Sequence, residues 1–344
     1  MLTFLRIGIL NGGGDCAGLN AVTRAVVKRA EEFGWQVVGI RYGWEGLLNA
    51  DTVNLSFDDV AGLVNQGGTV LKSSRTNPFK RPNGPQTIVE NVKKLGLDAM
   101  ICVGGDDTLG VAAQLYKRGL NIVGVPKTMD NDLSSTDYTF GFDSSVNEAT
   151  HMIDNLRTTA ESHDRVFVVE VMGREAGWVA AYAGIASGAN MTIVPEEPFD
   201  IEDVISFVRG RHEKGEKATV IVVSEGATLK SLKGIDQGKV DEFGHVRLGG
   251  IGQYLGDEIE KRTKYDTRVA ILGHTIRGGS PTAFDRVLST RFGLAAVQLI
   301  KDGNFGMMVS LRGTKITSVT LEESTSKTRT LDSEILDVTK AVSY

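Results

Sequence analysis

Cysteine is scarce in this chain of 344 residues, and long apolar runs are missing from it. The two cysteines, Cys16 and Cys102, stand in no CxxC or Cys/His ligand spacing. A reduced, cytoplasmic setting accounts for such sparse cysteine use most simply. No apolar run approaches the roughly 20 residues that a membrane-spanning helix needs, so we expect no membrane partner.

An excess of positive charge is missing as well. The 38 basic and 43 acidic residues leave a net charge of −5, which argues against nucleic acid or an acidic membrane as a partner. A small anionic substrate needs only a local basic cluster and stays open. The abundant residue is glycine, with 41 copies, many of them directly after apolar runs. Backbone turns sharply or approaches a ligand closely at such positions, which hints at phosphate-binding loops.

Short apolar strands alternate with amphipathic helices along the chain. Strands are expected at residues 5–10, 36–40, 99–103, 121–125, 166–171, 192–194, 219–223, 269–272 and 307–311. This alternation predicts an α/β fold with mainly parallel sheets covered on both faces, and the length suits two such domains. Residues 231–247 indicate a surface excursion. The polar tail, 314–344, ends in an amphipathic stretch that is expected to dock as a last helix.

A glycine-rich turn follows the first expected strand, with Gly12, Gly13, Gly14 and Asp15 leading into a helix. Glycines let backbone N–H groups face an anion, and the start of a helix favours negative charge. The alternative interpretation is that these residues form only a tight turn between strand and helix.

A second loop, Gly104-Gly105-Asp106-Asp107-Thr108, also follows an expected strand. Its carboxylates suit Mg²⁺, which takes one or two carboxylates together with phosphate oxygens. The alternative is that Asp106 or Asp107 caps the helix that follows.

A third loop carries Lys127, Thr128, Asp130 and Asp132 after the strand at 121–125. A carboxylate here could take the proton from an attacking hydroxyl, as phosphoryl transfer to an alcohol requires. An acidic turn with local side-chain hydrogen bonds is the competing interpretation.

Cationic residues stand beside glycines in two further segments, Met172-Gly173-Arg174 and residues 273–280 with His274 and Arg277. The guanidinium fork suits phosphate recognition, although single arginines are usually solvated. Glu225, at the end of the strand at 219–223, either accepts hydrogen bonds from sugar hydroxyls or caps the next element.

Taken in order from residue 11 to residue 281, these motifs closely resemble the phosphofructokinase family. The resemblance implies two Rossmann-like three-layer domains with the active site in the cleft between them. Residues 1–141 with 255–305 would form the larger, phosphate-donor domain, and 142–254 with 306–344 the smaller, fructose 6-phosphate domain. It also implies a kinase-type transferase that phosphorylates the 1-hydroxyl of fructose 6-phosphate with Mg²⁺, in glycolysis or gluconeogenesis.

The resemblance assigns roles residue by residue. Gly12 and Arg75 would lie against the donor phosphates, and Asp106 would contact Mg²⁺. Asp130 would be the base. The remaining positions would bind substrate or the transferring group: Lys127, Thr128, Asp132, Arg165, Met172, Gly173, Arg174, Glu225, Arg268, His274 and Arg277. In the family the counterparts of Arg165 and Arg268 come from a neighbouring subunit, which implies a homodimer or homotetramer.

The donor depends on Asp107 and Lys127, a pair that resembles the pyrophosphate-dependent branch. Asp107 would place bulk and negative charge where the α-phosphate and nucleoside of ATP must lie, so that pyrophosphate is favoured by obstruction of ATP. The alternative is that Asp107 and Lys127 pair with each other and leave ATP as the donor.

Two other classes fit less of the sequence. A Rossmann-type oxidoreductase predicts an acidic residue after the second strand, where Arg41 and Tyr42 stand instead. A non-catalytic sugar-phosphate sensor predicts loss of the base or the metal residue, yet Asp106 and Asp130 are both present.

Overall fold

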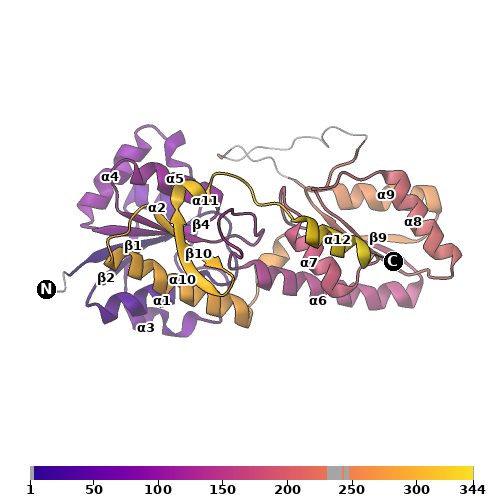
Figure 1. Ribbon diagram of the computed structural model, residues 1–344, viewed down its shortest axis with the longest axis horizontal. Coiled ribbons are helices and arrows are strands. Elements are labelled where there is room, and N and C mark those ends of the chain that lie inside the picture. Colours follow the sequence, from indigo (N-terminus) through magenta and orange to yellow (C-terminus); the bar gives the residue numbers. More distant parts are fainter. Residues whose placement is uncertain (1–3, 231–241, 244–247, 344) are drawn as a thin grey trace.

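Two α/β units lie side by side along the long axis of the molecule, each built on its own sheet (Figure 1). This computed structural model describes residues 4–230, 242–243 and 248–343. Apart from Glu242 and Phe243, the segment expected to be a surface excursion, 231–247, falls outside those residues. None of the helices in the described ranges has the length and apolar character needed to cross a bilayer.

The larger unit is built on a seven-stranded sheet in the order β11-β10-β5-β4-β1-β2-β3. Its inner strands pair in parallel, whereas β3 and β11 run antiparallel at the two edges. Strands β4 and β5 are buried along their whole length, as expected for parallel strands covered on both faces. The strands are β1 (Arg6–Asn11), β2 (Gln36–Ile40), β3 (Thr52–Leu55), β4 (Ala99–Gly104), β5 (Ile122–Pro126), β10 (Met307–Arg312) and β11 (Lys315–Thr320).

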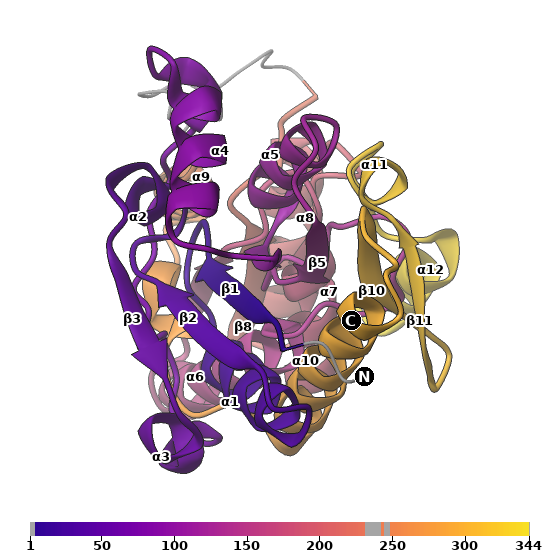
Figure 2. The ribbon, with the colours of Figure 1, turned by 90° about the vertical axis from the view of Figure 1, so that its left-hand side faces the viewer.

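Helices cover both faces of this sheet (Figure 2). On one face α1 (Leu19–Glu32) packs against α10 (Ala283–Lys301), and Gly293 of α10 lets the two backbones approach, because a Cβ there would lie 2.8 Å from the carbonyl oxygen of Val22. The other face carries α2 (Gly43–Asn49), α4 (Gly84–Lys94) and α5 (Asp106–Tyr116). The short α3 (Phe57–Val60) and α11 (Leu321–Ser324) complete this unit.

The smaller unit is built on a parallel four-stranded sheet in the order β7-β8-β6-β9. Alternate residues of its central strand serve opposite faces: Phe167 and Val169 join the core under α6 and α7, whereas Val166 and Val168 pack with α8 and α9. The elements are α6 (Phe142–His163), β6 (Val166–Val171), α7 (Trp178–Ser187), β7 (Met191–Ile193), α8 (Ile201–Glu213), β8 (Thr219–Ser224), α9 (Ile251–Thr263) and β9 (Thr267–Ile271). Both units therefore have the three layers of the expected Rossmann-like fold.

The strands of the last third of the chain correct the expected division into domains. Strand β9 pairs with β6 in the smaller sheet, although 255–305 was expected in the larger domain. Strands β10 and β11 extend the larger sheet from β5, although 306–344 was expected in the smaller domain. Ladder partners far apart in the chain decide sheet membership, and local sequence does not record them.

The tail makes two further elements, one expected and one not. The last helix forms as α12 (Ser333–Ala341) and packs against α7. Strand β11 was not expected, because it is a polar edge strand whose residues are exposed or only half-buried. Between the two, the chain crosses from the larger unit to the smaller one (Figure 1).

Candidate active site

Loops that follow strands of both sheets enclose one cleft. Its outer part is a cavity of about 830 Å³, lined from the larger unit by the glycine turn after β1 and from the smaller unit by Met172, Arg174 and Glu225. A deeper pocket of about 50 Å³ is lined by the loops after β4 and β5. Cavity and pocket share five lining residues, namely Gly13, Gly14, Arg75, Arg174 and Arg277. The carboxyl ends of parallel strands meet at such a crevice, as expected for this fold.

Of the three glycines in the glycine turn, Gly13 and Gly14 line the cleft. Gly12 donates its N–H to the carbonyl oxygen of Val103 at 2.9 Å, and a Cβ there would overlap the side chain of Thr108. Gly12, predicted to lie against the donor, therefore allows the close packing of the turn on α5. Gly14 is in contact with a functional side chain, since its Cβ would meet Nη1 of Arg277 at 2.8 Å.

Lys127 is only 4% exposed, and its ammonium lies against this turn. Its Nζ donates to the carbonyl oxygen of Gly14 at 2.5 Å. Burial lowers the pKa of Lys127 to about 8, against a smaller opposing effect of Cys16. Lys127 and Asp107 both line the inner pocket.

Asp106 and Asp107 form the first turn of α5, one residue after its N-cap, Gly105. The alternative that one of them caps the helix is therefore wrong. In this position their carboxylates lie in the favourable field of the helix start and line the inner pocket beside Thr108.

Asp130 is 4% exposed and lines the inner pocket. Its N–H donates to Oγ1 of Thr128 at 3.1 Å, and that hydroxyl lies 3.4 Å from its Oδ2. Its Oδ1 is buried without a hydrogen-bond partner in the described structure. A buried carboxylate oxygen without a hydrogen-bond partner is expected to face a ligand or an ion.

The loop around Asp130 is held by its own side chains. Asn131 adopts a left-handed backbone with φ of 52°, and its Oδ1 accepts the N–H of Thr139 at 3.1 Å. Oγ1 of Thr139 donates to the carbonyl oxygen of Thr128 at 2.6 Å. Burial, reinforced by neighbouring Asp130, raises the pKa of Asp132 to about 7. The expected acidic turn and the expected site residues are thus the same loop.

Across the cleft, Glu225 organises the loop after β6. Its Oε1 accepts the N–H groups of Gly173 at 3.3 Å and Arg174 at 3.2 Å, and burial raises its pKa. Gly226 permits this arrangement, because any Cβ there would overlap the carbonyl oxygen of Arg174. Arg174 itself has a left-handed φ of 53° and lines both cavity and pocket. Strain of this kind is held most often at functional sites.

The loop after β9 brings a further cation. His274 lines the outer cavity, and Arg277 lines both cavity and pocket. Nη1 of Arg277 donates to the carbonyl oxygen of Asp15 at 3.1 Å. Its Nε is buried without a hydrogen-bond partner in the described part of the chain.

Two predicted site residues lie away from this cleft. Arg165 precedes β6, and Nε donates to Oδ2 of Asp266 at 2.6 Å. Arg268, on β9, also pairs with Asp266. Both therefore stand at the amino-terminal end of strands whose carboxyl ends face the cleft.

Several lining residues were not predicted from the sequence. They are Tyr42, Thr69, Lys72, Ser73 and Leu248. The loop 69–75 joins the site because the N–H of Gly13 donates to the carbonyl oxygen of Ser74 at 3.0 Å and Oγ of Ser73 donates back to Gly13 at 2.5 Å. Only the polar run Lys72-Ser73-Ser74-Arg75 signals this loop in the sequence.

The inner pocket suits a magnesium ion. It gathers Asp106, Asp130 and Asp132, and one oxygen of Asp130 has no partner in the described structure. Among the described residues no group of three His, Cys, Asp or Glu side chains forms a complete metal cage. Mg²⁺ usually needs only one or two carboxylates, with phosphate oxygens and water as its other ligands.

Glycine turns, carboxylates and guanidinium groups that converge in a cleft between two α/β units define an enzyme of the phosphoryl-transfer class. The sequence profile of the family Phosphofructokinase matches residues 6–300. The chain belongs to the phosphofructokinase family and is a transferase of the kinase type.

Individual relatives differ in the donor that their names state. A pyrophosphate–fructose 6-phosphate 1-phosphotransferase of Amycolatopsis methanolica is 54% identical over 332 residues, covering 96% of this chain and 97% of the relative. An ATP-dependent 6-phosphofructokinase 3 of Streptomyces coelicolor is 48% identical over 329 residues, covering 95% and 96%. The crystal structure of Pichia pastoris phosphofructokinase in the T-state has a TM-score of 0.84 at 31% identity, and covers 99% of this chain but 36% of the yeast chain.

Proposed function

We propose that the chain transfers a phosphoryl group reversibly from pyrophosphate to the 1-hydroxyl of fructose 6-phosphate, giving fructose 1,6-bisphosphate and phosphate. The observation that carries this proposal is the buried Lys127 ammonium on the carbonyl oxygen of Gly14, with Asp107 in the same inner pocket. Together they offer a cation for a compact diphosphate and a carboxylate where an extended nucleotide would need space.

Asp130 acts as the general base. Its buried Oδ1 is free to accept the proton of the 1-hydroxyl, and its backbone is fixed by Thr128 and Asn131. As the proton moves to Asp130, the hydroxyl oxygen attacks the nearer phosphorus and the bond to the leaving phosphate breaks.

Cations of the cleft stabilise the charge that develops on the phosphoryl oxygens. Arg174, from the loop after β6, and Arg277, from the loop after β9, line both cavity and pocket, so both are placed to reach the transferring group. Lys127 holds the leaving phosphate, with Arg75 beside it, while Met172, Gly173, Glu225 and His274 bind the sugar phosphate. Such preorganised charges account for most of the catalysis expected in phosphoryl transfer.

Asp106 would hold Mg²⁺ together with Thr128 and Asp132 and the donor oxygens. The ion, when bound, neutralises phosphate charge. The orphaned oxygen of Asp130 and the carboxylates around it fit such a group.

The site is completed by a second copy of the chain in a homodimer or homotetramer. Arg165, just before β6, and Arg268, on β9, lie away from their own cleft, and β9 is an edge strand of the described smaller sheet. We place the enzyme in the cytoplasm, where free thiols such as Cys16 and Cys102 remain reduced.

A coupled assay with fructose 6-phosphate and Mg²⁺ tests the donor by comparing pyrophosphate with ATP on one preparation. Activity with pyrophosphate alone supports the proposal, and Asp107→Gly should then begin to admit ATP. Activity with ATP alone overturns the donor assignment and leaves the family intact. ATP deserves this direct comparison because ATP-dependent relatives are nearly as similar to the chain as pyrophosphate-dependent ones.

A further inference from the structure

Lys72 occupies a backbone conformation that lysine avoids. Its φ is 59°, in the left-handed region, where side chains other than those of glycine, asparagine and aspartate are disfavoured. A turn imposes this conformation, because the N–H of Lys72 donates to the carbonyl oxygen of Thr69 at 3.2 Å. Glycine would fit the turn with less strain, so the backbone conformation does not explain why this residue is a lysine.

The turn that carries Lys72 is attached firmly to the donor side of the cleft. Leu71, on one side, accepts the N–H of Tyr42 at 2.9 Å through its carbonyl oxygen. Ser73, on the other side, donates to the carbonyl oxygen of Gly13 at 2.5 Å. Lys72 is therefore held next to the glycine turn by its two neighbours in the chain.

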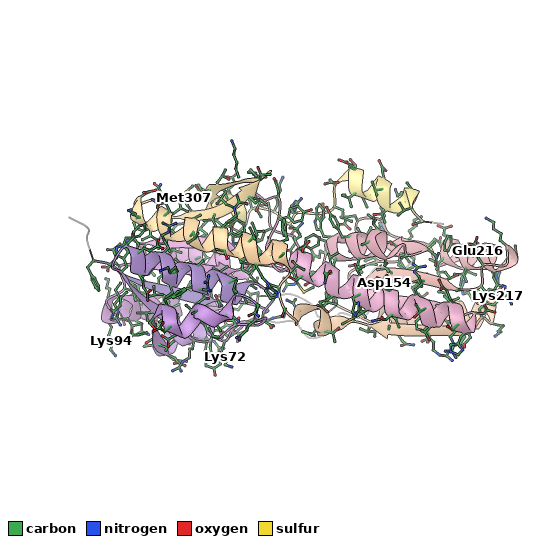
Figure 3. The ribbon with its side chains drawn as sticks, turned by 90° about the horizontal axis from the view of Figure 1, so that it is seen from below. Lys72, Lys94, Asp154, Glu216, Lys217 and Met307 are labelled. Atoms are coloured by element: carbon green, nitrogen blue, oxygen red, sulfur yellow. The ribbon has the colours of Figure 1, made fainter. Side chains whose placement is uncertain are left out.

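The Lys72 side chain lines the outer cavity but not the inner pocket. In Figure 3 it lies on the opposite side of the molecule from the yellow C-terminal helix. Within the described ranges its ammonium takes part in no hydrogen bond or ion pair. The same cavity holds the cations Arg75, Arg174 and Arg277 against the carboxylates Asp15 and Glu225. A cation that has no partner among the described residues and adds to a basic cavity suits an anion from outside the chain.

We infer that Lys72 is a donor-binding and specificity-determining residue, and that its ammonium contacts the phosphate of the donor that is not transferred. This inference rests on the proposed function, which places the donor beside Gly13 and Gly14. Lys127 holds that phosphate from beneath the glycine turn, whereas Lys72 approaches it from the outer cavity. Because pyrophosphate carries its charge in a small volume, a second cation favours it over a nucleotide whose outer part is uncharged.

Lys72→Gly removes the charge and relieves the strained backbone together, and two measurements report these effects separately: the KM for pyrophosphate reports the charge, and the melting temperature reports the backbone. We expect the KM for pyrophosphate to rise about tenfold, as for the loss of one charge-assisted hydrogen bond, with the KM for fructose 6-phosphate unchanged. The melting temperature should rise at the same time. Lys72→Arg should keep the wild-type KM.

Lys264→Gly is the matched control. Lys264 is also an exposed lysine at left-handed φ, 65°, but it ends α9 and lines neither cavity nor pocket. Its variant should gain stability with no change in either KM. If Lys72→Gly behaves in the same way as Lys264→Gly, the inference is overturned. If the wild-type enzyme uses ATP only, the proposed function fails. In that case the inference is tested with ATP as the donor, and an unchanged KM for ATP in Lys72→Gly overturns it.

Discussion

Three charged side chains of the cleft, Lys127, Asp132 and Glu225, have pKa values shifted toward their neutral forms, and burial is the largest cause for each. The site therefore holds its charges in an environment of low polarity. Charge interactions with phosphate oxygens are stronger there than in water. The same burial brings the pKa values of Lys127 and Asp132 close to neutral pH, to about 8 and about 7.

The titration of Lys127 should be visible in the pH dependence of pyrophosphate binding. Its pKa is lowered to about 8, so the fraction of charged ammonium in the free enzyme falls as pH rises through about 8. We expect the KM for pyrophosphate to rise above that pH, measured in steady-state assays from pH 6.5 to 9.5. In Lys127→Met the KM should be high throughout and lack this step. The same step in Lys127→Met would assign the titration to another group or to the donor.

Asp130→Asn removes the proposed base and keeps the shape of the side chain. We expect kcat to fall by about 10²–10⁴-fold with fructose 6-phosphate binding retained, because a general base contributes that much and the sugar has other contacts. Steady-state assays measure the fall in kcat, and calorimetry measures whether fructose 6-phosphate still binds. Asp154→Asn, on an exposed site of α6, is the control. Near-wild-type turnover in Asp130→Asn would assign the base elsewhere.

At the scale of elements, the segment between α11 and α12 ties the two units together beside the catalytic loop. The N–H of Arg329 donates to the carbonyl oxygen of Asp132 at 2.7 Å, and its Nη1 donates to that of Asp137 at 2.8 Å. The guanidinium lies 4.2 Å from the ring centre of Trp178, whose Nε1 donates to the carbonyl oxygen of Arg329 at 3.0 Å. One residue thus joins the loop after β5 to the start of α7.

Arg329→Ala deletes the guanidinium contacts and leaves both backbone hydrogen bonds possible. We expect a loss of about 2–3 kcal/mol in the free energy of unfolding, from one cation–π contact and one charged hydrogen bond. Activity should fall only modestly, because the bond to Asp132 comes from the main chain. Denaturant titration measures the loss. Arg291→Ala, which removes a half-buried arginine whose Nη2 donates an exposed hydrogen bond to the carbonyl oxygen of Thr314, should cost much less.

At the scale of the whole molecule, the cleft of one chain lacks two of the cations that its family resemblance implies. Arg165 and Arg268 are paired with Asp266 at the far end of the smaller sheet. Ile271, the last residue of β9, is 56% exposed. An edge strand with an exposed apolar side chain is a natural place for a second copy to pack.

Mixing two inactive variants tests whether the site is shared between copies. Asp130→Asn and Arg268→Ala should each be inactive alone. A hybrid dimer has one site with both residues intact, so random mixing after dissociation should restore about one quarter of wild-type activity in a twofold-symmetric dimer. Sites confined to single chains would give no recovery on mixing.

Much of the fold and of the site could be predicted because the signals are local. Apolar runs with period two or 3.6 mark β4, β5, β6 and α1, and glycine–acid loops after them mark the ends of strands. Chemistry-bearing residues from Gly13 to Arg277 then converge because parallel strands present their carboxyl ends together.

What the sequence by itself determined is the α/β alternation, the order of the loops, and the side chains available to the cleft, since periodicity and turn chemistry act within a few residues. Only the tertiary structure decided that β9 joins the smaller sheet, that β10 and β11 join the larger one, and that Gly12 packs on Thr108 while Gly13 and Gly14 line the cleft. It also brought Lys72 to the donor side. Strand pairing and close backbone approach depend on residues distant in the chain, and their free energies appear only when the whole molecule packs.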